Sequence, residues 1–169
     1  MPHTVEKFLL PSLALMSLLL FAATAAAERA SNTATQGNIT ATELLEAHAT
    51  FRSGFSAYQP ATAELESLAS IQQPITLWIV FGTWCHDSER EVPIVLKLLS
   101  AAANPNITVH LVSVEQDKQI PPALGVPFTI EYTPTLVLLD AQGKTMARWV
   151  EHPDSDWATD ISQALIASE

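Results

Sequence analysis

The stretch ITLWIVFGTWCHDS, residues 75–88, joins a run of strand-forming residues to the single cysteine of the chain. Its first seven residues, Ile75–Phe81, are apolar or β-branched and are bounded by Pro74 and Gly82. A short apolar run with such boundaries is typical of a strand covered on both faces. We therefore expect Ile75–Phe81 to be the central strand of a sheet, with Cys85 just beyond its carboxyl end.

The sequence after Cys85 predicts a helix and a second strand. Apolar residues recur at helical spacing over residues 92–99, within a helix expected from about Cys85 to Ala102. The loop 104–106, a proline between two asparagines, separates this helix from a strand expected over residues 107–114. Because a helix lies between them, the two strands should be parallel neighbours.

The last third of the chain predicts a loop, a hairpin and a final helix. Residues 119–127 contain three prolines and one glycine, so they should form a loop with at most one turn of helix. Strands over residues 136–139 and 145–150 would form a β-hairpin. Asp154 or Ser155 can cap a helix that follows it.

Two short helices are expected ahead of the central strand. Thr40 and Glu43 form the capping box of the first, which would carry His48 on its apolar face. Gly54 and Pro60 interrupt the pattern that follows. Apolar residues over 65–69 predict the second helix, which should end near Gln73-Pro74.

The first 27 residues have the features of a secretory signal peptide. A leucine- and alanine-rich run, Phe8–Phe21, is followed by Ala25-Ala26-Ala27, which matches the small-residue pattern of a cleavage site. We expect cleavage after Ala27 and a periplasmic or secreted protein; an uncleaved membrane anchor is the alternative. Residues 28–38 should be a flexible polar lead-in to a domain over residues 39–169.

Charge and cysteine content narrow the classes of partner. The formal net charge is −10, without any basic cluster. Such a chain is poorly suited to nucleic acid or anionic lipid, so we expect neither a nucleic-acid partner nor stable membrane association after signal cleavage. Cys85 has no partner for an intrachain disulfide, so it is a buried thiol, a reactive group or half of an intermolecular bond.

The position of Cys85 favours reactivity. A cysteine that opens a helix faces unpaired backbone N–H groups and the positive end of the helix dipole, and both favour thiolate over thiol. His86, when protonated, would act in the same direction, whereas Asp87 and Glu89 would oppose it. Trp84 borders the cysteine on an exposed turn, so we expect it to face a substrate.

The order of these elements resembles the thioredoxin-like superfamily. Its specific markers are Trp84-Cys85 directly after the central strand, Pro93 eight residues beyond the cysteine, and Thr133-Pro134 before the hairpin. The resemblance covers about residues 61–167, and GTWCHDSEREVP is similar to a bacterial branch of the family with a Trp-Cys-x-Asp-Ser motif. It implies an α/β fold with a central mixed sheet flanked by helices, here with an N-terminal helical extension.

The same resemblance implies a site. In the family, the proline that matches Pro134 is cis and lies beside the sulfur, where the preceding backbone pairs with an extended peptide. Substrate contacts are therefore expected at Trp84, His86, Thr133 and Pro134.

Two departures from the two-cysteine members of the family predict monothiol chemistry. Ser88 occupies the position of the second cysteine, and its hydroxyl can hydrogen-bond the thiolate but cannot form a disulfide. Ile79 occupies the position of the buried acid that thioredoxins carry six residues before the first cysteine. We expect Cys85 and Ser88 to be the catalytic residues of a thiol-disulfide oxidoreductase that acts without a cofactor. Its partners would be protein or low-molecular-weight thiols and disulfides, and an outside thiol would complete the reaction.

Two other interpretations stay open. A redox-silent module of the same fold would use the groove around Trp84, Cys85 and Thr133-Pro134 to hold peptide without chemistry. Metal delivery would combine Cys85 with histidines, but these lack ligand-like spacing, so no metal site is expected. The histidines concerned are His48, His86, His110 and His152.

Overall fold

The computed structural model describes residues 36–166. The expected signal peptide, residues 1–27, and residues 28–35 of the expected lead-in lie outside these described residues. Within the described part of the chain, no helix is both long and apolar enough to cross a membrane.

Five strands form one mixed sheet around the predicted central strand. β2 (Ile75–Phe81) pairs in parallel with β3 (Ile107–Ser113) and antiparallel with β4 (Thr135–Leu139). β1 (Gly37–Asn38) adds to the outer edge of β3, and β5 (Thr145–Val150) completes a hairpin with β4. The strand order is β1-β3-β2-β4-β5. The predicted parallel pair and the predicted hairpin are both confirmed.

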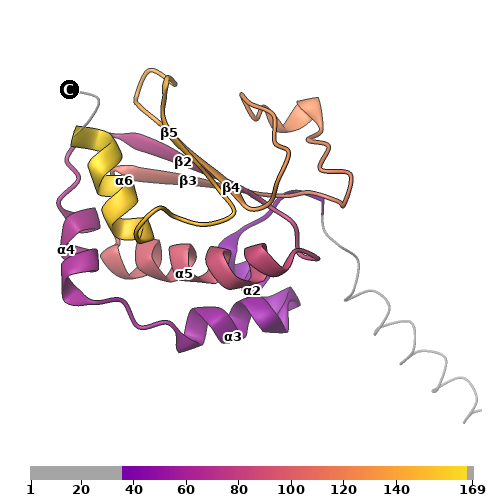
Figure 1. Cartoon of the computed structure of the whole chain (residues 1–169), viewed down its shortest axis with the longest axis horizontal. Coiled ribbons are helices and arrows are strands. Elements are labelled where there is room, and N and C mark those ends of the chain that lie inside the picture. Colours follow the sequence, from indigo (N-terminus) through magenta and orange to yellow (C-terminus); the bar gives the residue numbers. More distant parts are fainter. Residues whose placement is uncertain (1–35, 167–169) are drawn as a thin grey trace, which may run out of the picture. The chain divides into compact units, whose positions relative to one another are not determined.

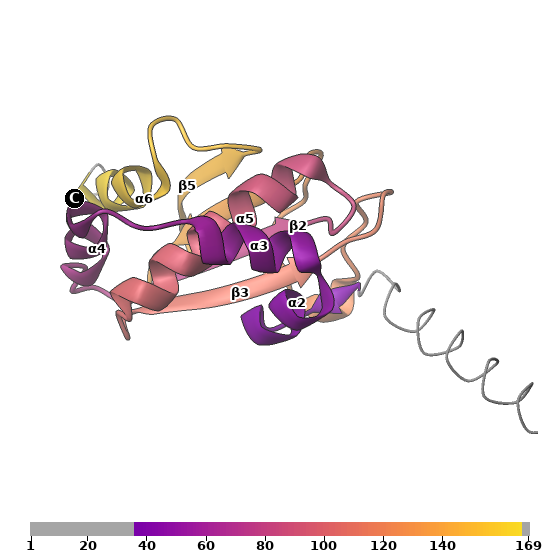
Figure 2. The same cartoon turned by 90° about the horizontal axis from the view of Figure 1, so that it is seen from below.

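The α-helices of the described residues pack against one face of this sheet (Figures 1 and 2). They are α2 (Ala41–Ala47), α3 (Ala49–Ala57), α4 (Thr62–Ala69), α5 (His86–Ala102) and α6 (Trp157–Ile166). Their buried residues join alternate residues of the strands in one apolar cluster. The predicted α/β fold, a mixed sheet flanked by helices with helices ahead of the central strand, is confirmed.

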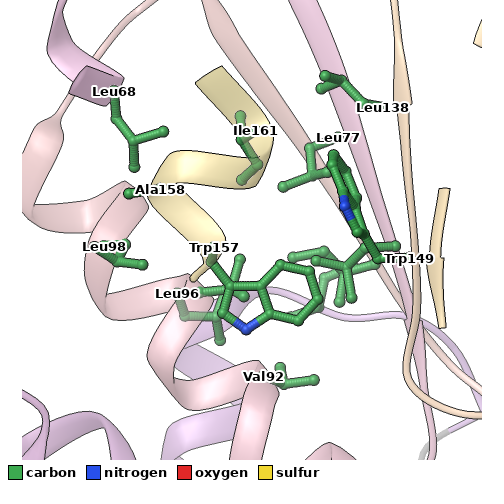
Figure 3. Packing of buried hydrophobic residues seen from close by; sticks show 14 of the residues in the cluster. Leu68, Leu77, Val92, Leu96, Leu98, Leu138, Trp149, Trp157, Ala158 and Ile161 are labelled. Carbon is green, nitrogen blue, oxygen red and sulfur yellow. The ribbon is translucent and has the colours of Figure 1, made fainter. Parts of the chain in front are cut away.

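Trp157 lies at the centre of this cluster. Figure 3 shows its ring between Val92 and Leu96 of α5 on one side and Trp149 of β5 on the other. The rings of Trp149 and Trp157 meet edge to face, with centroids 6.1 Å apart. Both tryptophans therefore belong to the core.

The opposite face of the sheet is covered by the irregular segment 115–134. Apolar side chains of this segment, among them Ile120 and Phe128, pack on the buried Trp78 and Val80 of β2. The segment contains a single short 3₁₀ helix, η1 (Pro122–Leu124). This agrees with the prediction of a loop with at most one turn of helix.

The prediction of a flexible lead-in that extends to residue 38 is wrong for its last residues. Gly37 and Asn38 form β1, and the Ile39 N–H continues the pairing with a hydrogen bond of 3.1 Å to the Leu111 carbonyl. Gly37 has a φ of +124°, which glycine adopts without a steric penalty. No sign of this strand is present in the sequence because residues 37 and 38 are not apolar. Backbone pairing with the edge of β3 places them in the sheet.

The expected end of the second helix near Gln73-Pro74 is wrong, because α4 ends at Ala69, where the Asn104 side chain donates to the last carbonyls of the helix.

A helix around Gly54 was not predicted, and the expected helical position of His48 is also wrong. His48 has φ −120° and ψ 106°, so it separates α2 from α3. Helix α3 carries the buried Phe51, and a Cβ at Gly54 would lie 3.0 Å from the Cβ of Pro93. The glycine is therefore explained by the close approach of α3 to α5 and does not break the helix.

The N-terminal cap of α6 also differs from the prediction. Asp156 takes this role, because its carboxylate accepts the backbone N–H of Thr159 at 2.8 Å. The N–H groups of Asp154 and Ser155 instead donate to the carboxylate of Asp160, at 2.7 and 3.2 Å. The two residues expected to cap α6 therefore donate their backbone N–H groups to Asp160, which lies inside the helix.

The capping box of α2 gives a testable prediction. The Glu43 N–H donates to Thr40 Oγ1 at 3.2 Å, and the Thr40 N–H donates to the Glu43 carboxylate at 2.8 Å. Thr40→Ala should lower the free energy of unfolding by about 1 kcal/mol. The hydrogen bonds from Thr40 also lower the pKa of Glu43. Stabilisation by Glu43 is therefore present above the ordinary pKa of a glutamate and is lost as the pH falls through the lowered value.

Urea unfolding at several pH values measures both effects. The difference in stability between wild type and Glu43→Gln should shrink as the solution is acidified. A stability difference that stays constant with pH would show that the ionised Glu43 carboxylate does not stabilise the fold. A Thr40→Ala variant as stable as wild type would show that the Thr40 cap does not stabilise it.

Candidate functional site

Cys85 lies between the carboxyl end of β2 and the start of α5. It is the N-cap residue of α5, with φ −94° and ψ 123°, and its carbonyl accepts the Glu89 N–H at 3.0 Å. The residue is half-buried. Its side chain therefore stands at the N-terminus of a 17-residue helix, as predicted.

The sulfur of Cys85 contacts the segment before β4. Cys85 Sγ is 3.0 Å from the carbonyl oxygen of Thr133, and the peptide bond between Thr133 and Pro134 is cis. In this contact the thiol donates and the carbonyl accepts, so the hydrogen bond exists only while the sulfur carries its proton. Residues 48 positions apart in sequence are thus joined at the sulfur.

Thr133 contributes an additional polar group beside this contact. The residue is only 2% exposed, and its hydroxyl is buried without a hydrogen-bond partner among the described residues. Buried hydroxyls are normally hydrogen-bonded, so a partnerless one next to the sulfur contact marks this position as unusual.

The indole of Trp84 forms one wall of the site. Its Nε1–H donates to the Val114 carbonyl at 3.0 Å, and the ring covers Gly82, where a Cβ would come within 2.6 Å of it. The ammonium of Lys118 lies 5.8 Å from the ring centroid. Trp84 is nevertheless 36% exposed, so it presents part of its ring to solvent beside Cys85.

Ser88 lies beneath the turn and not at its surface. It is fully buried, and its Oγ accepts the Gly82 N–H at 3.3 Å. The described residues show no hydrogen bond between Ser88 and Cys85. The geometry therefore gives Ser88 the role of holding the turn that carries the cysteine.

The other charged residues of the motif form a chain of contacts that leads to the core. Arg90 pairs with Asp87 at 2.8 Å and with Glu91 at 2.7 Å, and the Glu91 hydrogen bond raises the pKa of the guanidinium. Glu91 is buried and also accepts the indole N–H of Trp157 at 2.9 Å. His86, in contrast, is exposed and lies 3.9 Å from Glu89.

Sequence reasoning missed two exposed apolar side chains in the segments next to Thr133 and Pro134. Tyr132, which precedes Thr133, is 54% exposed, and Val150, which pairs with Thr135, is 37% exposed. We use the name apolar flank for these two residues and the exposed Trp84. A large aromatic residue next to the Thr-Pro pair was the available signal for Tyr132, whereas Val150 resembles any other strand residue.

The described residues contain no group of three His, Cys, Asp or Glu side chains that could hold a metal ion. His110 stacks on Trp78 at 4.1 Å, and His48 meets Phe51 edge to face at 5.9 Å. Nδ1 of His152 lies 2.9 Å from the Pro153 carbonyl. None of these three histidines is brought together with Cys85.

Comparisons with known proteins give one family match. A family model described as thioredoxin matches residues 38–162, a range that includes Cys85 and Pro134. No curated protein matches the chain.

Several solved structures are similar to this chain. A protein of unknown function from Pseudomonas aeruginosa is 23% identical, with 71% of this chain and 70% of that chain covered and a TM-score of 0.47. An HIV epitope scaffold is also 23% identical, with coverage of 70% and 72% and a TM-score of 0.45. A mutant of the alkylhydroperoxide reductase component AhpF from Enterococcus faecalis is 21% identical, with 50% of this chain and 38% of that chain covered and a TM-score of 0.38.

Proposed function

This chain belongs to the thioredoxin family, and we propose that it is an exported thiol-disulfide exchange protein of monothiol type, with Cys85 as the nucleophile. The observation that carries the proposal is the position of the sulfur. It is half-buried at the N-terminus of α5 and lies 3.0 Å from the carbonyl that precedes the cis Pro134. At such a position a substrate disulfide can reach the sulfur, which lies next to the backbone N–H groups of the first turn of α5.

The proposed cycle has two exchange steps. The Cys85 thiol loses its proton to solvent, and the thiolate attacks one sulfur of a substrate disulfide. A bond forms between Cys85 and that sulfur, while the second substrate sulfur leaves as a thiolate and takes a proton from solvent. An outside thiolate then attacks the mixed disulfide, and Cys85 leaves as the thiolate that begins the next cycle.

An outside thiol is required because the chain offers no second sulfur. Cys85 is the single cysteine of the sequence, and the position three residues later holds the buried Ser88. Ile79 is also fully buried and has no group that could move a proton near this position. In this proposal Ser88 positions the turn, while Trp84, His86 and the Thr133-Pro134 backbone contact the substrate.

Export is part of the proposal. Residues 1–27 would direct secretion and be removed after Ala27, which leaves a protein in the periplasm or outside the cell without stable attachment to a membrane. Its substrates would then be thiols and disulfides of an oxidising compartment.

A redox-silent peptide-binding module is the second candidate. One observation favours it, because the hydrogen bond from Cys85 to the Thr133 carbonyl requires a protonated sulfur. A protein that keeps this bond would use the apolar flank for binding and leave Cys85 without a chemical role. The two candidates differ in the reactivity of a single sulfur.

Trapping of mixed disulfides tests the proposal. Cells that express the full chain are treated with a rapid alkylating quench, and Cys85 adducts from the extracytoplasmic fraction are identified by mass spectrometry. We expect disulfide-linked partners with wild type and none with Cys85→Ser, from a mature chain that begins at Glu28. Failure to trap any partner, in cells where control thiol proteins are trapped, would favour the binding module.

The pH profile of Cys85 alkylation separates the candidates in purified protein. An exchange protein should be alkylated by iodoacetamide at neutral pH at least as fast as a free cysteine peptide, because only thiolate reacts. A sulfur that reacts slowly at neutral pH in the folded protein but normally after unfolding would indicate the binding module.

A further inference from the structure

The outer edge of β3 is covered over only part of its length. β1 pairs with Val112 and Ser113, and the Ile39 N–H donates to the Leu111 carbonyl at 3.1 Å before the chain turns into α2. No strand of the described residues pairs with residues 107–110 on this side. We call residues 107–110 the open edge. It pairs with the start of β2, at the opposite end of that strand from Cys85.

The open edge presents backbone groups without partners. Successive residues of a strand direct their N–H and C=O groups to opposite sides. Because the Leu111 carbonyl faces Ile39, Val109 directs both its N–H and its C=O to the same side, away from β2. The Ile107 C=O also faces this side, whereas the Ile107 N–H donates to the Asn104 carbonyl at 3.2 Å. One donor and two acceptors are therefore available to an added strand.

The open edge lacks the features that usually prevent a strand from joining a sheet. Proteins protect such edges with proline, with charged side chains or with a bulge. Residues 107–110 include no proline, lysine, arginine or carboxylate, and their register with β2 runs without a bulge. Thr108, Val109 and His110 are all exposed, and Val109 is one of the large apolar residues that remain 36% exposed.

A cavity of about 430 Å³ lies beside the open edge. Ile107, Val109 and Leu111 line it on the side of β3, and Leu96 and Leu99 line it on the side of α5. No charged residue lines this cavity. In an antiparallel pair, residues that lie opposite each other have side chains on the same face of the sheet. A residue paired with Val109 would therefore direct its side chain into the cavity.

Glu43 gives the open edge a negative charge. It lines a neighbouring hollow together with Val109 and His110. Both hydrogen bonds from Thr40 reach Glu43 Oε2, and among residues 36–166 no hydrogen bond or ion pair reaches Oε1. The Thr40 hydrogen bonds lower the pKa of Glu43, so its carboxylate is ionised at neutral pH. The complementary partner group is a lysine or arginine side chain.

The same charge argues against a second copy of the chain as the partner. Pairing of two open edges would bring two Glu43 carboxylates to one interface, between chains that each have a formal net charge of −10. Repulsion between like charges opposes such a dimer. A different polypeptide with cationic side chains meets no such repulsion.

We infer that the open edge docks an extended segment of another protein, which adds to the sheet antiparallel to β3. The segment places an apolar residue opposite Val109 and a lysine or arginine close to that residue. Its main chain bonds the free groups of Val109 and Ile107, its apolar side chain fills the cavity, and its cation pairs with Glu43. This site is separate from Cys85 and does not depend on the proposed exchange function.

Matched peptides test the inference. The probe is Thr-Lys-Thr-Leu-Thr-Lys-Thr, blocked at both ends, in which the lysines share one face of the strand with the leucine. Three controls replace the leucine by alanine, methylate the leucine nitrogen, or replace both lysines by glutamate. Binding at low salt is measured by fluorescence anisotropy, and hydrogen exchange of the Val109 N–H is followed by NMR with and without peptide.

We expect the lysine peptide to slow exchange of the Val109 N–H by about 10-fold or more. The alanine peptide should bind about 10-fold more weakly, because less apolar surface is buried. The N-methyl peptide should bind about 5-fold more weakly, since it lacks the donor to the Val109 C=O. The glutamate peptide should bind about 3-fold more weakly, as expected for an exposed charge pair.

Matched variants of the protein test the two specificity elements. Ser100→Phe places a ring in the cavity from an exposed position and should weaken binding of the lysine peptide about 10-fold. Ala101→Phe, at the next exposed position of α5, should leave binding unchanged. Glu43→Gln should abolish the difference between the lysine and glutamate peptides, whereas Glu46→Gln on the same helix should preserve it. Circular dichroism checks that each variant is folded.

Several outcomes would overturn the inference. A Val109 N–H that is already protected without peptide would show that a second copy, or another part of the chain, covers the open edge. Absence of binding by the lysine peptide, or equal effects of Ser100→Phe and Ala101→Phe, would exclude the edge and its cavity as the site. Equal effects of Glu43→Gln and Glu46→Gln would exclude pairing with Glu43. Cys85→Ser should bind the lysine peptide as wild type does, so none of these failures affects the exchange proposal.

Discussion

Trp157→Ala should lower the free energy of unfolding by about 3–5 kcal/mol, the range observed when a buried tryptophan is truncated. The ring is 2% exposed and packs between α5 and β5, so its removal leaves a cavity that the sheet and helices cannot close (Figure 3). It also leaves Glu91 Oε2 without its hydrogen-bond donor in a buried setting. Urea unfolding followed by circular dichroism measures the change.

Two further variants make this prediction specific. Trp157→Phe keeps an aromatic ring but removes the donor to Glu91, and we expect a smaller loss of about 1–3 kcal/mol. Ile166→Ala, in the same helix but 73% exposed, should change stability by less than about 0.5 kcal/mol. A Trp157→Ala variant as stable as Ile166→Ala would show that α6 is not part of the folded core.

Ser88→Cys should convert the monothiol site into one that forms an internal disulfide. Ser88 lies in the first turn of α5, three residues after Cys85, and its side chain is fully buried beneath the turn that carries the cysteine. A second thiolate there would attack the mixed disulfide on Cys85 and release the partner without any outside thiol. We expect trapped partners to disappear almost completely and the oxidised protein to lose two hydrogens by mass.

The matched control is Ser88→Ala, which removes the hydroxyl without adding sulfur. It loses the acceptor for the Gly82 N–H but should still trap partners through Cys85. If Ser88→Cys folds yet keeps two free thiols under oxidising conditions, the two side chains do not meet and the proposed relation to the two-cysteine members fails. If Ser88→Ala also stops trapping, the hydroxyl itself is needed for the reaction.

Much of the fold could be predicted because its signals are local. The apolar run at β2 and the helical spacing in α5 each lie within one element, and the two strands of the hairpin are neighbours in sequence; all three features were predicted. The capping box of α2 was also correct, since both of its partners lie within three residues of each other. Such features need no knowledge of the rest of the chain.

The errors share a different cause. β1 exists because the edge of β3 is available to it, and α3 contains a glycine because α5 approaches closely. Asp156 rather than Asp154 caps α6 because Asp160 binds the N–H groups before it. In the first two cases a residue on another element decides the local structure, and in the third a side chain inside the same helix does.

The candidate site also combines features that the sequence predicts with features that only the structure shows. The sequence alone determined that one sulfur opens a helix after a buried strand and that no second sulfur can resolve its disulfide, because both follow from residue identity and spacing. Only the tertiary structure decided that the Thr133 carbonyl reaches that sulfur and that Ser88 is buried beneath the turn. The first relation joins residues 48 positions apart, and it depends on packing between segments that no local pattern encodes.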